Sequence, residues 1–100
     1  MKILAIEKES LNACDEDFKP YLESEAARVW ELYQEGVIRE LYFRQDRSEA
    51  VLMLECPDMR QAKEILASLP LVKAGLIGFE VMLLRPYSGF SRLFDSGSID

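Results

Sequence analysis

Histidine is absent from the 100-residue chain. Its absence excludes the Ser-His-Asp and Cys-His catalytic schemes, histidine-ligated haem and Cys2His2 zinc sites. It also removes the side chain that most often acts as a general base near neutral pH. Any acid-base chemistry must therefore use a carboxylate, a phenol, a lysine or a thiol.

Long apolar runs and paired cysteines are also missing. Every stretch without a charged residue is far shorter than the roughly 20 residues that span a bilayer. Cys14 and Cys56 are distant in sequence and form no CxxC pair, unlike the dense cysteines of small secreted domains. The first residues meet charge too early for a signal peptide. We expect a cytoplasmic protein with free thiols.

Basic residues are scarce, since 12 Lys and Arg stand against 18 Asp and Glu, for a formal charge of −6. A negative chain is a poor partner for nucleic acid or an anionic membrane. Residues 1–35 hold nine acidic and four basic side chains, whereas the remainder is almost balanced. We interpret the acidic part as the outer surface of the first helix, and we expect the nearly neutral part to line any pocket.

The order of periodic segments predicts an α+β fold. Strand patterns occupy residues 3–8, 37–44, 50–55 and 76–84, and helical spacing occupies residues 18–33 and 59–69. Pro20 suits the first turn of the first helix, Gly36 its end, and Asp58 the cap of the second. The order strand, helix, strand, strand, helix, strand is that of a ferredoxin-like domain. We assign residues 1–88 to this domain and residues 89–100 to a C-terminal tail.

Three of the predicted strands are apolar on both faces. Two helices can cover only one face of a four-stranded antiparallel sheet, so the other face needs a cover. Either the tail folds beneath the sheet or the sheet packs on that of a second copy. The tail offers few apolar side chains, chiefly Phe90, Leu93 and Phe94. We therefore favour a homodimer, with the tail docked on the partner subunit.

A set of turn and cap residues carries a resemblance to a known family. The residues are Gly36, Pro57, Leu69-Pro70-Leu71, Arg85-Pro86 and Ser88. In this pattern, which covers residues 33–88, the chain resembles the muconolactone isomerase family. The resemblance implies a dimeric α+β barrel, often assembled into larger rings, with a small-molecule pocket. It also implies a proton shift within an unsaturated lactone, without metal or organic cofactor. YciI-like proteins and small monooxygenases share the fold.

The second strand holds the first candidate site. Alternation places Ile38, Glu40, Tyr42 and Arg44 on one face of this strand. Where the muconolactone isomerases have histidine after the arginine that matches Arg39, this chain has Glu40. A glutamate in a dry pocket can serve as a base, and the phenol of Tyr42 can hydrogen-bond a carbonyl oxygen. The alternative is that Glu40 and Arg44 are charged residues of a solvated edge strand.

Glu80 is the other candidate catalytic residue, a lone carboxylate between apolar neighbours in the last strand. A charge there is costly unless it is paired, so Glu80 either marks a pocket or pairs with an arginine at a dimer interface. Arg39 and Arg85 can each bind a substrate carboxylate, or serve as structural ion-pair partners.

The remaining chemistry-bearing residues have structural interpretations. Tyr21, Trp30 and Tyr33 fit a core or an interface, and Cys56 fits packing because it has no neighbour that would activate it. The acidic run at positions 15–17 lacks the spacing of a calcium loop and suits a helix start. The sequence thus leaves two functions open, a cofactor-free isomerase of small molecules and a non-catalytic ligand-binding or stress-related module.

Overall fold

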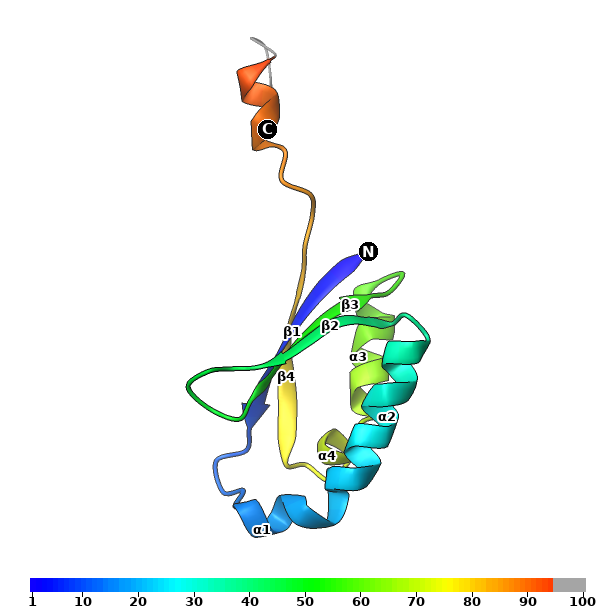
Figure 1. Cartoon of the computed structure of the whole chain (residues 1–100), viewed down its shortest axis with the longest axis vertical. Coiled ribbons are helices and arrows are strands. Elements are labelled where there is room, and N and C mark those ends of the chain that lie inside the picture. The colour runs from blue at the N-terminus through cyan, green and yellow to red at the C-terminus, as the bar shows by residue number, and fades with distance from the viewer. Residues whose placement is uncertain (95–100) are drawn as a thin grey trace.

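The computed structural model describes residues 1–94 as one sheet with helices on a single face, followed by an extended tail (Figure 1). The strands are β1 (Lys2–Glu9), β2 (Ile38–Phe43), β3 (Ala50–Glu55) and β4 (Ile77–Leu83). The α-helices are α1 (Asp15–Phe18), α2 (Leu22–Gln34), α3 (Met59–Ala67) and α4 (Pro70–Lys73). Two 3-10 helices, η1 (Lys19–Tyr21) and η2 (Gly89–Leu93), complete the described elements.

The sheet has the strand order β2-β3-β1-β4, and every neighbouring pair is antiparallel. The two strands next to each other in sequence, β2 and β3, form a hairpin, while β1 and β4 each connect to the hairpin through helices. This is the ferredoxin-like arrangement, so the predicted fold class is confirmed. No helix within residues 1–94 is long and apolar enough to cross a bilayer.

Local sequence signals explain most element ends. The Asp58 carboxylate accepts a hydrogen bond from the Gln61 amide at 2.8 Å and caps α3, as predicted. Gly36 follows α2 with a φ of 82°, a conformation that glycine adopts without strain. The first helical segment begins earlier than predicted, at Asp15, and Pro20 lies in η1, where the chain bends before α2 begins.

The core lies between the helices and the face of the sheet that they cover. Alternate residues of β1 and β3 point into it, and α2, α3 and the turn before α4 close it from the other side. Its largest fully buried side chains are Ile3, Leu32, Ile38, Leu54 and Leu69. Cys56 is buried here, which confirms its packing role, whereas Cys14 is exposed.

A bulge in β2 changes the predicted alternation. Ile38 pairs with Leu54 on the helix-covered face and is 1% exposed. The register shifts between Ile38 and Glu40, so Glu40 pairs with Met53 on the opposite face. Placing Ile38 on the same face as Glu40 and Tyr42 was therefore wrong, because strict alternation does not hold across a bulge.

The other face of the sheet is apolar and carries no helix. Leu4 of β1 lies between Met53 of β3 and Met82 of β4, and all three side chains are only half-buried. We call this surface the open face. The described part of the tail does not cover it, since the chain beyond β4 runs away from the domain (Figure 1). Phe90 remains 66% exposed, so residues 89–94 of the predicted tail do not fold beneath the sheet, and the rest of that tail, residues 95–100, lies outside the described residues.

Candidate functional site

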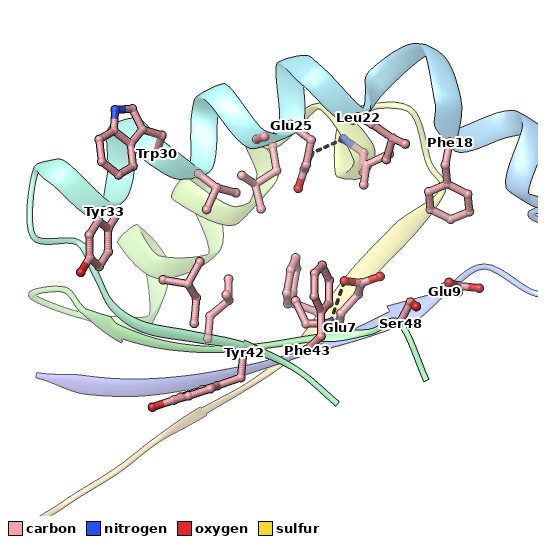
Figure 2. A pocket seen from close by; sticks show the side chains of 18 of the residues that line it. Glu7, Glu9, Phe18, Leu22, Glu25, Trp30, Tyr33, Tyr42, Phe43 and Ser48 are labelled. Carbon is pink, nitrogen blue, oxygen red and sulfur yellow. Dashed lines mark hydrogen bonds between the residues drawn. The ribbon is translucent and has the colours of Figure 1, made fainter. Parts of the chain in front are cut away.

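A cavity of about 780 Å³ lies between α2 and the sheet (Figure 2). We call it the helix-side cavity. Its walls come from β1, β2, β3, β4 and α2 together with the segment before α2. The lining residues are Glu7, Glu9, Asp15, Phe18, Lys19, Leu22, Glu25, Ala26, Val29, Trp30, Tyr33, Leu41, Tyr42, Phe43, Ser48, Ala50, Leu52, Leu69, Leu71 and Phe79.

The cavity exists because α2 packs tightly at only one end. Leu32, near its carboxyl end, is the buried residue of this helix, whereas Leu22 at its start is 53% exposed. Between them the cavity is bordered by Ala26 of α2, and Ala50 of β3 is another of its lining residues. Side chains this short cannot bridge the gap between helix and strand. A space that a packed core would fill is therefore left open.

Glu7 brings a carboxyl group to the sheet side of the cavity. It follows Ile3 and Ala5 on the inward face of β1 and is only 6% exposed. Its Oε1 accepts a hydrogen bond from the Ala50 amide at 2.9 Å. Burial raises the pKa of Glu7 above its usual value, with smaller contributions from the nearby carboxylates of Glu9, Glu49 and Glu25. Glu7 is thus a buried acid that can hold or release a proton.

Glu25 brings a second carboxyl group to the helix side. Its Oε1 accepts a hydrogen bond from the Leu71 amide at 2.9 Å, which joins α2 to α4. Burial raises the pKa of Glu25 as well. In Figure 2 the Glu25 side chain points from α2 toward the sheet, and Glu7 lies on the sheet below it. The cavity therefore has a carboxyl group of raised pKa on each of two facing walls.

An ionic cluster holds the β2–β3 hairpin beside the cavity. Arg44 forms two hydrogen bonds with Asp46, at 2.9 and 2.7 Å, and its Nη1 lies 3.6 Å from Glu49 Oε1. Glu49 is 7% exposed and its Oε2 accepts a hydrogen bond from the Glu9 amide at 3.2 Å. The charge of Arg44 is therefore neutralised within the hairpin and does not serve the cavity.

Aromatic side chains stand at the rim. The rings of Trp30 and Tyr33 are stacked on α2, with centroids 6.0 Å apart and planes inclined by 28°. Trp30 is 58% exposed and Tyr33 is 47% exposed. Both residues line the cavity and are about half exposed, so a place in the core is wrong for them, while a place in an interface stays a prediction.

The predicted pair Glu40 and Tyr42 does come together. The Tyr42 hydroxyl donates a hydrogen bond to Glu40 Oε1 at 3.0 Å, and this bond raises the pKa of the phenol. Figure 2 shows the Tyr42 side chain pointing away from the space between helix and sheet. The hydrogen bond between these two side chains thus lies on the open face, although Tyr42 also borders the helix-side cavity.

Glu80, Arg39 and Arg85 do not join that pair within one copy of the chain. Glu80 is on the open face at the other edge of the sheet, with its Oε1 4.0 Å from Lys8 Nζ. Arg39 turns back, and its Nε donates a hydrogen bond to the Gly36 carbonyl. Arg85 is exposed beyond the end of β4. Their roles as catalytic or substrate-binding residues stay predictions.

Sequence reasoning missed Glu7 and Glu25. A signal was present for Glu7, because alternation from Ile3 and Ala5 places it on the buried face. Glu25 adjoins Ala26 and Val29 of the apolar helical stripe, which is a weaker signal. The charge interpretation was also wrong, because acidic residues of the first 35 positions line the cavity instead of forming only an outer surface.

Metal ligation has no support in the described residues. Among residues 1–94, no group of three or more Cys, Asp and Glu side chains is arranged to hold a metal ion. The acidic run at positions 15–17 forms the first turn of α1, and Asp17 Oδ2 accepts a hydrogen bond from the Cys14 amide at 3.1 Å. That run acts as the predicted helix start.

Comparison with known proteins gives a fold but no family. No protein-family model and no curated protein matches the chain. Among solved structures, it is similar to the 5-chloro-2-hydroxyhydroquinone dehydrochlorinase TftG from Burkholderia phenoliruptrix AC1100, in complex with 2,5-dihydroxybenzoquinone. The TM-score is 0.65 at 16% sequence identity, over 89% of this chain and 98% of that one. At this identity the similarity shows a shared ferredoxin-like α+β fold, and the resemblance to muconolactone isomerases stays a prediction.

Proposed function

We propose that this protein binds a small ring compound in the helix-side cavity and moves a proton on it without a cofactor. The observation that carries the proposal is the buried carboxyl group of Glu7 inside a cavity with largely apolar walls. A cavity of about 780 Å³ is in the size range of small-molecule sites. Burial raises the pKa of Glu7, which makes its carboxylate a stronger base than that of an ordinary glutamate and suits it to general acid-base work.

The chemistry follows from the carboxyl group of Glu7. The carboxylate of Glu7 takes a proton from a carbon next to a carbonyl group, and the electron pair moves onto the carbonyl oxygen as an enolate. Glu7, now protonated, then returns the proton at another carbon of the conjugated system and is again a carboxylate. The electrons move back from the oxygen, so a double bond shifts and nothing is oxidised or reduced. Each carboxyl group keeps its position through one backbone amide, Ala50 for Glu7 and Leu71 for Glu25.

The similarity to TftG supports a small cyclic substrate. That protein is named for action on a substituted hydroquinone and was solved with a dihydroxybenzoquinone. A ferredoxin-like fold can host many activities, so this support concerns the size and type of ligand and not the reaction.

A second candidate site is the open face. We propose that two copies of the chain pack these faces together, and that the Glu40–Tyr42 pair and Glu80 then lie in the space between the sheets, with Arg39 and Arg85 available for a substrate carboxylate. The hydrogen bond between Tyr42 and Glu40 favours this site, because it already joins a base to a hydroxyl donor. The apolar side chains Leu4, Met53 and Met82 favour the dimer, since they are left half-exposed.

A non-catalytic binding module is the second candidate function. The open cavity by itself favours it, because binding needs the apolar walls and the rim aromatics but no proton transfer. The two functions differ in whether the carboxyl groups change the rate of a reaction or only the affinity for a ligand.

The test uses α-angelica lactone, a small uncharged unsaturated lactone whose double bond moves into conjugation by a proton shift. Proton NMR follows its conversion to the β isomer with wild type, Glu7→Gln and Glu25→Gln. We expect wild type to accelerate the conversion and Glu7→Gln to lower the rate about 100-fold or more, as for loss of a general base.

Matched variants on the open face separate the two sites. Glu40→Gln and Glu80→Gln make the same chemical change outside the cavity, and we expect both to keep the wild-type rate. Loss of rate in these variants alone would move the reaction to the open face. Binding without any acceleration would establish the non-catalytic module, and absence of both binding and acceleration would contradict the proposal.

A further inference from the structure

We infer that the helix-side cavity selects ring compounds that carry a hydrogen-bond donor and no negative charge, and rejects ring carboxylates. This inference rests on the proposed function, because it names the ligand class of the same site. It also differs from the expectation that arginines hold a substrate carboxylate.

The charge of the lining is strongly one-sided. The cavity is bordered by four carboxyl groups, from Glu7, Glu9, Asp15 and Glu25, and by a single ammonium group, from Lys19. Lys19 Nζ is 3.0 Å from Glu16 Oε1, and its side chain is 65% exposed to solvent. The one cation is therefore paired and screened, whereas Glu7 and Glu25 face the interior of the cavity. A ligand carboxylate would meet repulsion from both.

No arginine offsets this repulsion of a ligand carboxylate, because none lines the cavity in the described part of the chain. Two arginines of the surrounding elements already have partners. Arg28 of α2 donates to Ser68 Oγ and to Glu31 Oε1, each at 3.0 Å. Arg44 of the hairpin is held by Asp46 and Glu49. The forked guanidinium that usually binds a carboxylate is therefore missing from this site.

The two carboxyl groups that face the interior of the cavity, Glu7 and Glu25, offer acceptors. Oε1 of Glu7 and Oε1 of Glu25 are each used by one backbone amide, and no hydrogen bond within residues 1–94 occupies their Oε2 atoms. An ionised carboxylate has acceptor positions and no donor. A ligand hydroxyl, amide N–H or ammonium group supplies the donor that these oxygens lack, while a ligand carboxylate cannot.

The apolar walls of the cavity favour a flat apolar ring as the rest of the ligand. Apolar side chains from the sheet and the helix surround the carboxyl groups, among them Val29, Leu52 and Phe79. The rings of Trp30 and Tyr33 stand at the rim. A flat apolar ring buries its faces against these side chains and directs one polar substituent to Glu7 or Glu25.

The experiment compares three benzene derivatives of similar size at pH 7.5: benzamide, benzylamine and benzoate. Isothermal titration calorimetry gives the dissociation constants for the full chain, and the indole NMR signal of Trp30, the single tryptophan, reports whether the cavity is occupied. We expect benzoate to bind at least tenfold more weakly than benzamide and benzylamine.

A matched pair of variants assigns the selectivity to the cavity. Glu25→Gln removes one charge from the lining. We expect it to reduce the ratio of the benzoate and benzamide dissociation constants several-fold. Glu23→Gln makes the same change two residues earlier on α2, outside the lining, and we expect it to leave the difference unchanged.

The outcomes separate this inference from the proposed function. Benzoate that binds as tightly as benzamide, with the Trp30 signal shifted, would overturn the inference and keep the cavity as a ligand site. An equal effect of Glu23→Gln and Glu25→Gln would also overturn it, because general charge would then explain the selectivity. If none of the three compounds binds, the proposed function fails together with the inference.

Discussion

The two sides of the sheet differ in how deeply their carboxyl groups are buried and in what those groups bind. On the helix-covered face, Glu7 and Glu25 are partly or wholly buried, and each carboxyl group is held by one backbone amide. On the open face, Glu40 and Glu80 are exposed, and their partners are the side chains of Tyr42 and Lys8. A buried carboxyl group with few partners is costly and is typical of functional sites. An exposed charge at the edge of a sheet costs little and discourages unwanted strand pairing.

The difference shows that an apolar neighbourhood in sequence is a poor guide to burial. Glu80 lies between Phe79 and Val81, yet its side chain is 60% exposed because the open face has no cover in one copy of the chain. Glu7 lies between Ile6 and Lys8 and is nearly inaccessible. Which face a residue occupies, and what covers that face, decide its environment.

The largest expected effect is on stability, and it differs between the two faces of β3. Leu54 is fully buried beneath the helices, and Leu54→Ala should lower the free energy of unfolding by about 2–5 kcal/mol. Met53→Ala, on the open face of the same strand, should cost clearly less when measured on dilute protein. Urea unfolding followed by circular dichroism gives both values. Equal losses of unfolding free energy in the two variants would show that the two faces of β3 are packed equally well, and would contradict the difference between the covered face and the open face.

The open face as a dimer interface is tested by a charge at its centre. Met53→Lys should convert a dimer into a monomer, because an unpaired ammonium between two apolar sheets is unfavourable. Sedimentation velocity measures the mass of wild type and variant. Leu11→Lys, at a fully exposed loop position, is the matched control and should leave the mass unchanged. A wild-type protein that sediments as a monomer would contradict the proposed dimer directly.

Removal of the tail should have an intermediate effect on dimer affinity and on the melting temperature. Phe90, Leu93 and Phe94 are all more than half exposed in one copy, so we predict that the tail docks on the partner subunit. A chain that ends at Ser88 should then dissociate at higher protein concentration than the full chain and should melt at a lower temperature. Unchanged dimer affinity and unchanged melting temperature would show that the tail has no part in the assembly.

A smaller effect is the pH dependence of stability that arises from Glu7 on the helix-covered face. The raised pKa of Glu7 means that the folded state binds its proton more tightly than the unfolded state. Its contribution to stability is therefore present below the unfolded pKa, near 4.5, and is lost as the pH rises through the folded pKa. Glutamine does not ionise, so the melting temperature of Glu7→Gln relative to wild type should increase across this window. The charged groups that face Glu7 and add to the effect are Glu9, Glu49 and Glu25.

The matched measurement for that window is Glu40→Gln on the open face. Glu40 is exposed, so this variant makes the same substitution without removing a buried carboxyl group. A melting-temperature difference between Glu7→Gln and wild type that stays constant with pH would contradict the assignment of Glu7 as a buried acid.

The smallest expected effect is at the edge of the open face. Tyr42→Phe removes the hydrogen bond to Glu40, which is exposed to solvent, and should leave the free energy of unfolding almost unchanged. Tyr42 borders the helix-side cavity, but its hydroxyl points away from it, so loss of the hydroxyl alone should leave benzamide binding, measured by calorimetry, unchanged. A large loss of binding would indicate that the open face contributes to the site.

Local signals in the sequence were sufficient for the fold. Hydrophobic periodicity gave the strands and the helices, and Asp58 and Gly36 act at the helix ends where their chemistry predicts. These features depend on residues a few positions apart. The bulge between Ile38 and Glu40 could not be predicted in this way, because it is set by the pairing of β2 with β3, which are joined by a hairpin but matched residue by residue only in the folded sheet.

The candidate site was less predictable than the fold. The sequence placed Glu40 beside Tyr42 correctly, since residues two apart on a strand share a face. It did not indicate the helix-side cavity, because Glu7, Glu25 and Phe79 are far apart in the chain and meet only after folding. The lack of histidine, the acidic balance and the βαββαβ order were determined by the sequence alone. Tertiary structure decided which acids are buried, because burial depends on how far α2 stands from the sheet and not on any single residue.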